Sequence, residues 1–417
     1  MKPTNDSTAA ASGAVDSAAS FNRRDFLLTA AAMAALPNLS ACAQPSSNVL
    51  RVAVIGHTGK GNYGHSMDTL WLALPETQVV GFADANEAGH EKEKAKLPGV
   101  PAFTDYRKML AELKPDIVSV ATRHIGEHRD MILAAAEAGV KGIYCEKPLC
   151  RTPAEADEIV EACKKSGTLL SVAHRNRFHP TLPVVIDAVK SGLIGDLLEI
   201  RCRGKEDQRG GCLDLWVLGS HDLDLCLAIA GKPISCSAVI QQGDRPATKA
   251  DIVEGAEAVG PILGDRVHAR YLMENGVPVY FDSIKGKGVP KAGFGIQLIG
   301  NKGLVDFRID VDPIAHFVPG NPFQPTKEAR PWTPITSAGV GEPEPLTKIG
   351  KDVAGHITAA RDLISAISEK RDPLCNDKTC RTVVEMIHGV FASHVNNSAN
   401  VALPLTQREH GLSPWLT

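Results

Sequence analysis

Basic clusters and stacking aromatics, the usual marks of a nucleic-acid-binding protein, are scarce in this sequence. The chain has 45 lysines and arginines against 48 acidic residues, a formal net charge of −3, and no basic run that could follow a phosphate backbone. Aromatic residues make up only 5% of its 417 residues, so platforms for stacked bases are few. We therefore expect no nucleic-acid partner. The 43% of hydrophobic residues is enough to fill the cores of two domains.

The ten cysteines lack the spacing of a disulfide framework or a metal site. Cys375 and Cys380 lie close together, but they have no second pair and no histidine near them in the sequence. We therefore predict no metal, and we expect most cysteines to be small core residues.

The apolar stretch at residues 26–36 is too short to cross a bilayer. It follows the pair Arg23-Arg24 and so resembles a bacterial twin-arginine export signal. Residues 39–42 resemble a lipobox, and the same region also fits a small-x-small cleavage site. We expect residues 1–45 to be signal and linker. The protein is then exported to the periplasm or cell surface, with membrane association only through this signal or through a lipid on Cys42.

From residue 50 onwards, short apolar runs alternate with helical stretches. A helix is expected over 127–138, rich in alanine and closed by Gly139. The order is typical of an α/β Rossmann domain with a doubly wound parallel sheet, which we place at 46–174. Its buried parallel strands are predicted at 51–56, 79–84, 117–121 and 142–145.

Residues 175–417 show a different pattern, with helices at 182–191 and about 215–230 followed mainly by strands. Asn-Gly and Lys-Gly turn signals separate the strands, as in an antiparallel sheet. We predict an α+β domain for substrate binding and oligomerisation, with a large open, mostly antiparallel sheet, and C-terminal helices that pack back on the first domain. The predicted strands of this sheet are 267–273, 277–284, 294–300 and 303–309, and the C-terminal helices are 353–368 and 378–395.

A glycine-rich turn follows the first strand. Gly59, Gly61 and Gly64 have the G-x-G-x-x-G spacing before an expected helix, where bare backbone can approach a pyrophosphate. Asp84, twenty residues later at the end of the second strand, can accept hydrogen bonds from the adenosine ribose. Ala85 rather than an arginine follows, which favours NAD and leaves NADP as the alternative. Two extra residues between the strand and Gly59 require the turn to bulge.

Glu146, Lys147 and Pro148 follow the strand 142–145, at the sheet edge where doubly wound folds bind ligands. A lysine there can exchange a proton with a hydroxyl or carbonyl oxygen while a hydride moves. Glu146 can orient it electrostatically, and Pro148 stiffens the turn. An ion pair on the surface is the alternative interpretation.

These residues, with further motifs, resemble the Gfo/Idh/MocA oxidoreductases, the relatives of glucose-fructose oxidoreductase and inositol dehydrogenase. The resemblance covers about residues 50–405 and is carried by the glycine turn, Asp84, Thr122 with His128, Glu146-Lys147-Pro148, His174 to Phe178, Gly210-Gly211, and Gly219-Ser220-His221 with Asp224. It implies a sheet domain that mediates homodimers or homotetramers. It also implies that Lys147 and His221 are catalytic and flank a substrate hydroxyl above the nicotinamide. The cofactor-binding set that it implies is Gly59, Gly61, Tyr63, Gly64, Asp84, Thr122, His128, Glu146 and Lys147.

One position departs from this family pattern. Family members carry an aspartate four residues before the histidine, one helical turn away, but Val217 stands there in this chain. Asp214 lies seven residues before His221 and Asp224 three residues after it, so both are candidates for shaping the pocket. The charged loop 205–209 is interpreted as solvated surface rather than substrate contact. The predicted substrate-binding set is Arg175, Arg177, Asp214, His221 and Asp224.

We therefore predict an NAD(P)-dependent oxidoreductase that transfers a hydride between a tightly bound nicotinamide and a hydroxyl or carbonyl of a sugar or polyol. Tight binding is expected because an exported enzyme has no soluble nicotinamide pool. Two alternatives stay open. One is a glycosidase or lyase that oxidises a glycoside transiently, and the other, motivated by Val217, is a catalytically weak sugar-binding protein.

Overall fold

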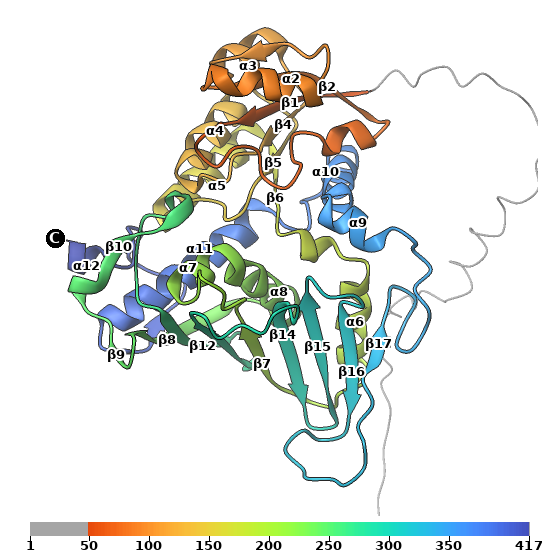
Figure 1. Ribbon diagram of the computed structural model, residues 1–417, viewed down its shortest axis with the longest axis vertical. Coiled ribbons are helices and arrows are strands. Elements are labelled where there is room, and N and C mark those ends of the chain that lie inside the picture. The colour runs from red at the N-terminus through yellow and green to blue at the C-terminus, as the bar shows by residue number, and fades with distance from the viewer. Residues whose placement is uncertain (1–48, 417) are drawn as a thin grey trace, which may run out of the picture. The chain divides into compact units, whose positions relative to one another are not determined.

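A parallel sheet opens the described part of the protein, residues 49–416 of a computed structural model (Figure 1). The twin-arginine pair and Cys42 lie outside these residues. Six strands lie in the order β3-β2-β1-β4-β5-β6, all paired in parallel. The predicted Rossmann-type sheet is thus confirmed. Its strands are β1 (Leu50–Gly56), β2 (Thr77–Asp84), β3 (Ala102–Phe103), β4 (Ile117–Val120), β5 (Gly142–Cys145) and β6 (Leu169–Val172).

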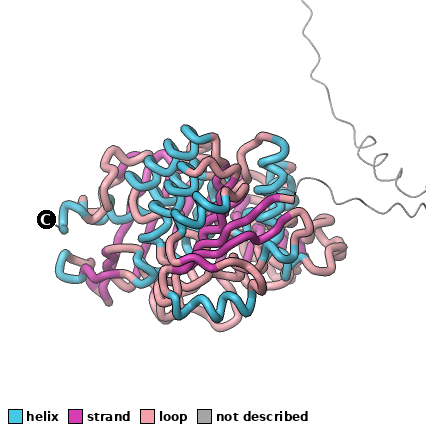
Figure 2. Tube along the Cα trace, turned by 90° about the horizontal axis from the view of Figure 1, so that it is seen from above, coloured by secondary structure: helices cyan, strands magenta, loops and turns pink. Residues whose placement is uncertain are grey.

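Helices cover both faces of this sheet, and in Figure 2 the strands run between them. Local signals set their ends: α5 starts after Thr152, whose side chain accepts from the Glu155 amide, and it stops at Gly167 in the left-handed conformation. The helix predicted at 127–138 is present as α4, two residues displaced at its start. The helices are α2 (His90–Lys96), α3 (Tyr106–Leu113), α4 (Ile125–Glu137) and α5 (Pro153–Ser166).

The segment between β1 and β2 contradicts one prediction, because no α-helix follows the glycine turn. Residues 57–69 form turns, and only a short 3-10 helix, Leu70–Ala73, precedes β2. Three non-glycine residues after the turn's first glycines, Asn62, His65 and Ser66, have positive φ angles of 55°, 43° and 62°. A right-handed helix cannot continue through left-handed residues, so the chain does not form one here.

The second sheet has ten strands and is mostly antiparallel, as predicted; within it only β13 and β7 pair in parallel among the described strands. Its main path is β17-β16-β15-β14-β7-β13-β12-β8-β18, with β9 on β8. The strands are β7 (Leu197–Arg203), β8 (Pro233–Gln242), β9 (Arg245–Pro246), β12 (Arg266–Met273), β13 (Pro278–Ile284), β14 (Phe294–Gly300), β15 (Gly303–Ile309), β16 (Ala315–Pro319), β17 (Thr333–Ile335) and β18 (Val401–Ala402). A separate hairpin joins β10 (Ile252–Glu254) to β11 (Pro261–Leu263).

Helices from the second half of the chain pack on both sheets, and α11 (Asp377–Val395) contacts strands of each. The helices α8 (Ser220–Ala230) and α11 pack on the second sheet, and α11 also contacts α5. The helix α10 (Ile357–Glu369) contacts β5 and β6. Over residues 49–416 no helix is both long and apolar enough to cross a membrane. The remaining helices are α6 (Thr181–Lys190), α7 (Cys212–Asp214), α9 (Ile349–Ala354) and α12 (Ser413–Leu416).

Candidate active site

A cavity of about 170 Å³ lies at the carboxyl ends of β4, β5 and β6, against α8 and the second sheet. This is the edge at which open α/β sheets bind ligands. The cavity brings together Lys147 and His221, the two residues predicted to be catalytic, from different parts of the chain. Its polar lining consists of His65, Arg123, Glu146, Lys147, Arg175, Lys205, Arg209, His221, Glu257, Asp310 and His356.

Lys147 is only 7% exposed. Its Nζ donates to the carbonyl oxygen of Val217 at 2.6 Å. Burial is the main cause that lowers the pKa of Lys147, and it outweighs the opposing charges of Glu146 and Glu257. The amine therefore gives up its proton more readily than an exposed lysine, which suits a group in acid–base catalysis.

Glu146 is fully buried and stays charged. Burial would raise the pKa of this carboxyl, but the hydrogen bond with His65 and the charges of His65 and Lys147 lower it to about 2. One carboxylate oxygen bonds His65 Nδ1 and the other accepts from the Lys147 amide at 2.7 Å. A side chain at Gly64 would meet Oε1 at 2.2 Å, so only glycine admits Glu146 to this place.

The helix that carries His221 is interrupted by a π-helical turn. It runs from α7 through the π segment Leu215–Gly219 into α8. A π turn is wider than an α turn and is frequent at functional sites. Here it lies where the Val217 carbonyl accepts from Lys147, so a backbone oxygen contacts the lysine at the position where the resemblance led us to expect an aspartate.

His221 is 6% exposed, and its Nδ1 is buried without a hydrogen-bond partner among residues 49–416. Its ring packs edge-on against Phe294, with centroids 6.2 Å apart, and against His174 at 5.3 Å. Burial, followed by the charge of Lys147, lowers the pKa of His221 well below its usual range. The ring is therefore neutral at physiological pH and acts through hydrogen bonds.

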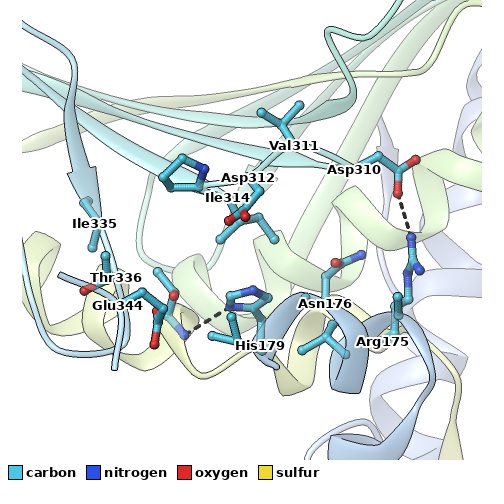
Figure 3. A pocket seen from close by; sticks show the side chains of 16 residues that line it. Arg175, Asn176, His179, Asp310, Val311, Asp312, Ile314, Ile335, Thr336 and Glu344 are labelled. Atoms are coloured by element: carbon cyan, nitrogen blue, oxygen red, sulfur yellow. Dashed lines mark hydrogen bonds and ion pairs between the residues drawn. The ribbon is translucent and has the colours of Figure 1, made fainter. Parts of the chain in front are cut away.

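Asp310 lies between two cavities and pairs with two cations. Its carboxylate accepts from Arg175 at 2.7 Å and from Lys205 at 3.1 Å. On the far side is a second cavity of about 260 Å³ (Figure 3), where His179 and Glu344 also contribute to the wall. Arg175, a member of the predicted substrate-binding set, thus lies in the lining of both cavities.

Three of the other predicted substrate-binding residues, Arg177, Asp214 and Asp224, are engaged outside the cavity lining. Arg177 donates to the Asp224 carbonyl at 2.7 Å, and the Asp224 side chain is fully buried. Asp214 accepts from Ser283 at 2.6 Å and from the Glu206 amide at 2.9 Å. Spacing along a regular helix had suggested a common face, but the π turn rotates the residues before it away from that face.

Asp84 ends β2 as predicted, but its carboxylate is already satisfied by the protein. It is fully buried and accepts from the Thr58 amide at 3.0 Å, the Thr58 hydroxyl at 2.6 Å, the Asn86 amide at 2.9 Å and the Tyr63 hydroxyl at 3.2 Å. The Tyr63 ring covers Gly56, where a side chain would meet it at 2.2 Å. The turn is therefore closed over the acceptor that a ribose would use.

The strand itself offers a second register for the glycine fingerprint. Because β1 ends at Gly56, G-x-G-x-x-G counted from there places Thr58 at the middle position and Gly61 at the third. A side chain at Gly61 would meet the His124 amide at 2.5 Å, so this glycine allows close packing. The bulge that we predicted depends on this choice. Counted from Gly59, the turn carries two extra residues after the strand, and counted from Gly56 it carries none.

Thr122 and His128 hold the turn rather than line the cavity. The Thr122 hydroxyl donates to the Lys60 carbonyl at 2.7 Å. His128 contacts the carbonyls of Thr122 at 2.8 Å and Pro148 at 3.0 Å, and both side chains are fully buried. These contacts hold the segment that follows β4 against the segment that follows β5 and contains Lys147.

Several lining residues were missed by sequence reasoning. Lys205 and Arg209 belong to the loop interpreted as solvated surface, yet they line the cavity. His65 follows Gly64 directly, and that adjacency was a usable signal. His356 carries no local signal, because it lies far from the other lining residues in the sequence and the fold brings it to the cavity, where it bonds Tyr144 at 2.6 Å.

The parts present fit a dinucleotide chemically. Bare glycine backbone and the Asp84 carboxylate suit the adenosine and pyrophosphate end, provided that the Tyr63 hydroxyl gives way to ribose hydroxyls. The buried Lys147 and His221, together with the unpartnered His221 nitrogen, suit the nicotinamide and substrate end.

Comparison with known proteins supports this placement. Residues 50–174 match the Gfo/Idh/MocA model, described as an oxidoreductase family with an NAD-binding Rossmann fold. The chain is 27% identical to D-glucoside 3-dehydrogenase of Escherichia coli (strain K12) over 202 residues, 45% of this chain and 56% of the relative. It is 25% identical to myo-inositol 2-dehydrogenase of Thermotoga maritima over 190 residues, 43% of this chain and 55% of the relative. The chain thus spans about half the length of these curated relatives.

A solved structure of levoglucosan dehydrogenase in complex with NADH and L-sorbose has the same fold. It superposes with a TM-score of 0.68 at 21% identity, covering 85% of this chain and 99% of the other. The resemblance of the first domain to the Gfo/Idh/MocA oxidoreductases, predicted from motifs, is therefore confirmed, and the similarity of fold extends through the second sheet.

Proposed function

We propose that this chain, whose first domain is a Gfo/Idh/MocA Rossmann domain, is an NAD-dependent oxidoreductase that transfers a hydride to or from a sugar or polyol carbon. The observation that carries the proposal is the meeting of Lys147 and His221 in one buried cavity at the carboxyl edge of the parallel sheet. The names of two relatives, D-glucoside 3-dehydrogenase and myo-inositol 2-dehydrogenase, agree with this proposal.

The chain's own residues divide the work. NAD, when bound, supplies or accepts the hydride. Lys147, with its lowered pKa, takes the proton from the substrate hydroxyl during oxidation and returns it during reduction. The neutral His221 orients that hydroxyl by a hydrogen bond. Glu146 remains ionised through its bond with His65 and sets the charge beside Lys147.

The charge of the lining narrows the substrate to an acidic sugar or polyol. Five lysines and arginines face the cavity against three carboxylates, and a fourth carboxylate outside the lining, that of Asp207, pairs with Arg209. Arg175 and Lys205 share a single carboxylate, that of Asp310. Arg123 has no carboxylate at ion-pair distance among the described residues, and its Nε donates to the Gly61 carbonyl at 3.3 Å. A substrate carboxylate would balance this surplus of positive charge.

The setting of the enzyme forms part of the proposal. The N-terminal motif supports export by the twin-arginine route to the periplasm or cell surface, with Cys42 as a possible lipid attachment. An enzyme exported in the folded state keeps its cofactor bound and resets it with a second substrate. The large sheet is the surface through which we expect a homodimer or homotetramer to form.

The test is a screen of purified protein that follows the absorbance of bound reduced nicotinamide. Neutral sugars, polyols, aldonic acids and uronic acids are compared at equal concentration. We expect the acids to reduce the bound nicotinamide faster than the neutral compounds do. Cleaved glycosides without net oxidation would instead establish the transient-oxidation glycosidase. Sugar binding without turnover in any class would establish a binding protein and overturn the proposal.

A further inference from the structure

A histidine and a pair of cysteines, about 200 residues apart in the sequence, meet one side chain away from the active cavity. All three are residue types that bind metals. His174 follows β6, Cys375 precedes α11, and Cys380 lies in the first turn of α11. His174 Nδ1 is 3.5 Å from Cys375 Sγ and 3.8 Å from Cys380 Sγ, and the two sulfurs are 3.4 Å apart. None of the three side chains is more than 1% exposed.

These separations are close to the edges of a zinc tetrahedron. Zinc binds sulfur at about 2.3 Å and imidazole nitrogen at about 2.0–2.1 Å, which places two sulfur ligands about 3.8 Å apart and a sulfur and a nitrogen about 3.5 Å apart. Shifts of a few tenths of an ångström would bring the three atoms onto one ion. Two thiolates and an imidazole are also the ligand types that zinc prefers.

A carboxylate lies beside one of the three ligands, although no Asp224 oxygen is within 4.8 Å of all three ligand atoms. Asp224 Oδ1 is 3.5 Å from Cys375 Sγ, while Asp224 Oδ2 is fully buried and has no hydrogen-bond partner among the described residues. A buried carboxylate oxygen without a partner costs free energy, and metal coordination removes that cost. Arg177 lies 3.5 Å from the same carboxylate and balances the negative charge of the ligand set.

We infer that His174, Cys375 and Cys380, completed by a shift of the Asp224 carboxylate towards them, form a buried structural site for a divalent cation that favours sulfur and nitrogen ligands, with zinc as the cation tested first. The ion enters during folding, because no ligand is accessible in the folded chain, and its binding releases the two thiol protons. This site is independent of the proposed dehydrogenase activity. The sequence predicted no metal because it shows no histidine near Cys375, and the fold brings one from residue 174.

The site joins three elements around the cavity. His174 belongs to the end of the parallel sheet, Asp224 to α8, and the cysteines to the start of α11. The Cys375 carbonyl also accepts from the Val172 amide at 2.9 Å, so the loop before α11 is already tied to β6. The His174 ring packs on His221, so the site adjoins the active cavity.

The chain contains a matched control pair. Cys202 and Cys226 are also buried, with sulfurs 3.3 Å apart, but within residues 49–416 they belong to no group of three metal-ligating side chains. They represent two thiols that are simply packed in a core. A metal that needs the full ligand set is lost when Cys375 and Cys380 are substituted, and it is kept when Cys202 and Cys226 are substituted.

The experiment measures metal in the full chain produced with zinc, and again with cobalt in its place, and purified without chelators. We expect about one ion per chain and a thiolate-to-cobalt charge-transfer band in the cobalt form. The double variant Cys375→Ser/Cys380→Ser should lose both the ion and the band. The control Cys202→Ser/Cys226→Ser should keep both.

Three results would overturn the site: no bound ion in the unsubstituted protein, equal metal content in the two double variants, or a disulfide between Cys375 and Cys380 in the protein as isolated. If the Cys375→Ser/Cys380→Ser chain fails to fold, the cobalt spectrum of the unsubstituted protein still decides. Dehydrogenase activity plays no part in these readouts, so a failure here leaves the proposed function untouched.

Discussion

The two ends of the proposed cofactor site differ in how completely the protein satisfies its own polar groups. At the adenosine end, the Asp84 carboxylate accepts from Thr58, Asn86 and Tyr63. At the substrate end, His221 Nδ1 and His356 Nε2 are buried without a hydrogen-bond partner in the described part of the chain. An unsatisfied buried polar atom costs about 1–3 kcal/mol, so a ligand there removes a penalty. At the glycine turn, by contrast, a ligand only replaces hydrogen bonds that Asp84 already accepts from the protein.

This difference assigns separate roles to the two ends. The cavity is built in advance around Lys147, and changes there should alter turnover. The turn competes with the cofactor, and changes there should alter NAD affinity. Substitutions that reversed these effects would break the comparison.

The largest effect is expected from Lys147→Ala. Loss of the proton-transfer group should reduce kcat by about 10²–10⁴-fold, while the Kd for NAD changes little. Steady-state kinetics and calorimetry measure the two quantities. Lys141→Ala is the control, because Lys141 forms a surface pair with Asp116 at 2.9 Å and should leave kcat unchanged. Weaker NAD binding at unchanged kcat would assign Lys147 to the cofactor instead.

The pH dependence of alcohol oxidation should move in Glu146→Gln. The reaction needs the neutral amine of Lys147, so the rate rises with pH through the lowered pKa of this lysine. The ionised Glu146 raises that pKa, and its removal lowers it further, so the rising limb should shift by about one pH unit towards lower pH.

The shift is read from kcat/KM measured across the pH range. Glu91→Gln, which removes a carboxylate from a surface pair with Lys94 at 2.8 Å, should leave the profile in place. Movement towards higher pH in Glu146→Gln would show that a group other than Lys147 titrates.

A smaller effect, about tenfold, is expected from Arg123→Gln. If Arg123 binds the substrate carboxylate, its loss removes a charge-assisted hydrogen bond of about 1.5 kcal/mol. KM for aldonic or uronic acids should rise, and KM for neutral sugars should not. Arg129→Gln, at a surface pair with Glu158, serves as the control. Equal changes for acidic and neutral substrates would remove the argument for an acidic sugar.

How much the sequence revealed depended on whether the signal was local. The strand predicted at 142–145 is β5 residue for residue, and the one at 51–56 is β1 with one residue more, since buried apolar runs bounded by turns are a local pattern. The helix expected after Gly64 is absent, because left-handed residues in the turn interrupt it. Glycine spacing alone could not show whether the fingerprint starts at Gly56 or Gly59.

The site was predictable at Lys147 and His221 because motifs marked both. It was not predictable at His356, nor for the group of His174 with Cys375, because tertiary contacts between residues about 200 positions apart create them. The roles of Asp214 and Asp224 depended on helix faces. A single π turn, which no residue pattern announced, separates Asp214 from His221, whereas Asp224 lies with His221 on α8.

The smallest effect, a few-fold, is expected from Tyr63→Phe, which tests the closed end directly. Burial and then the charge of Asp84 raise the pKa of Tyr63, so its hydroxyl keeps the proton and donates to that carboxylate. Without the hydroxyl, Asp84 is free for ribose hydroxyls, and NAD should bind a few-fold more tightly, in line with one hydrogen bond of about 1 kcal/mol. Calorimetry measures the change, with Tyr106→Phe on α3 as the control. Weaker binding in Tyr63→Phe would mean that this hydroxyl contacts the cofactor itself, and that the two ends of the site are built in advance alike.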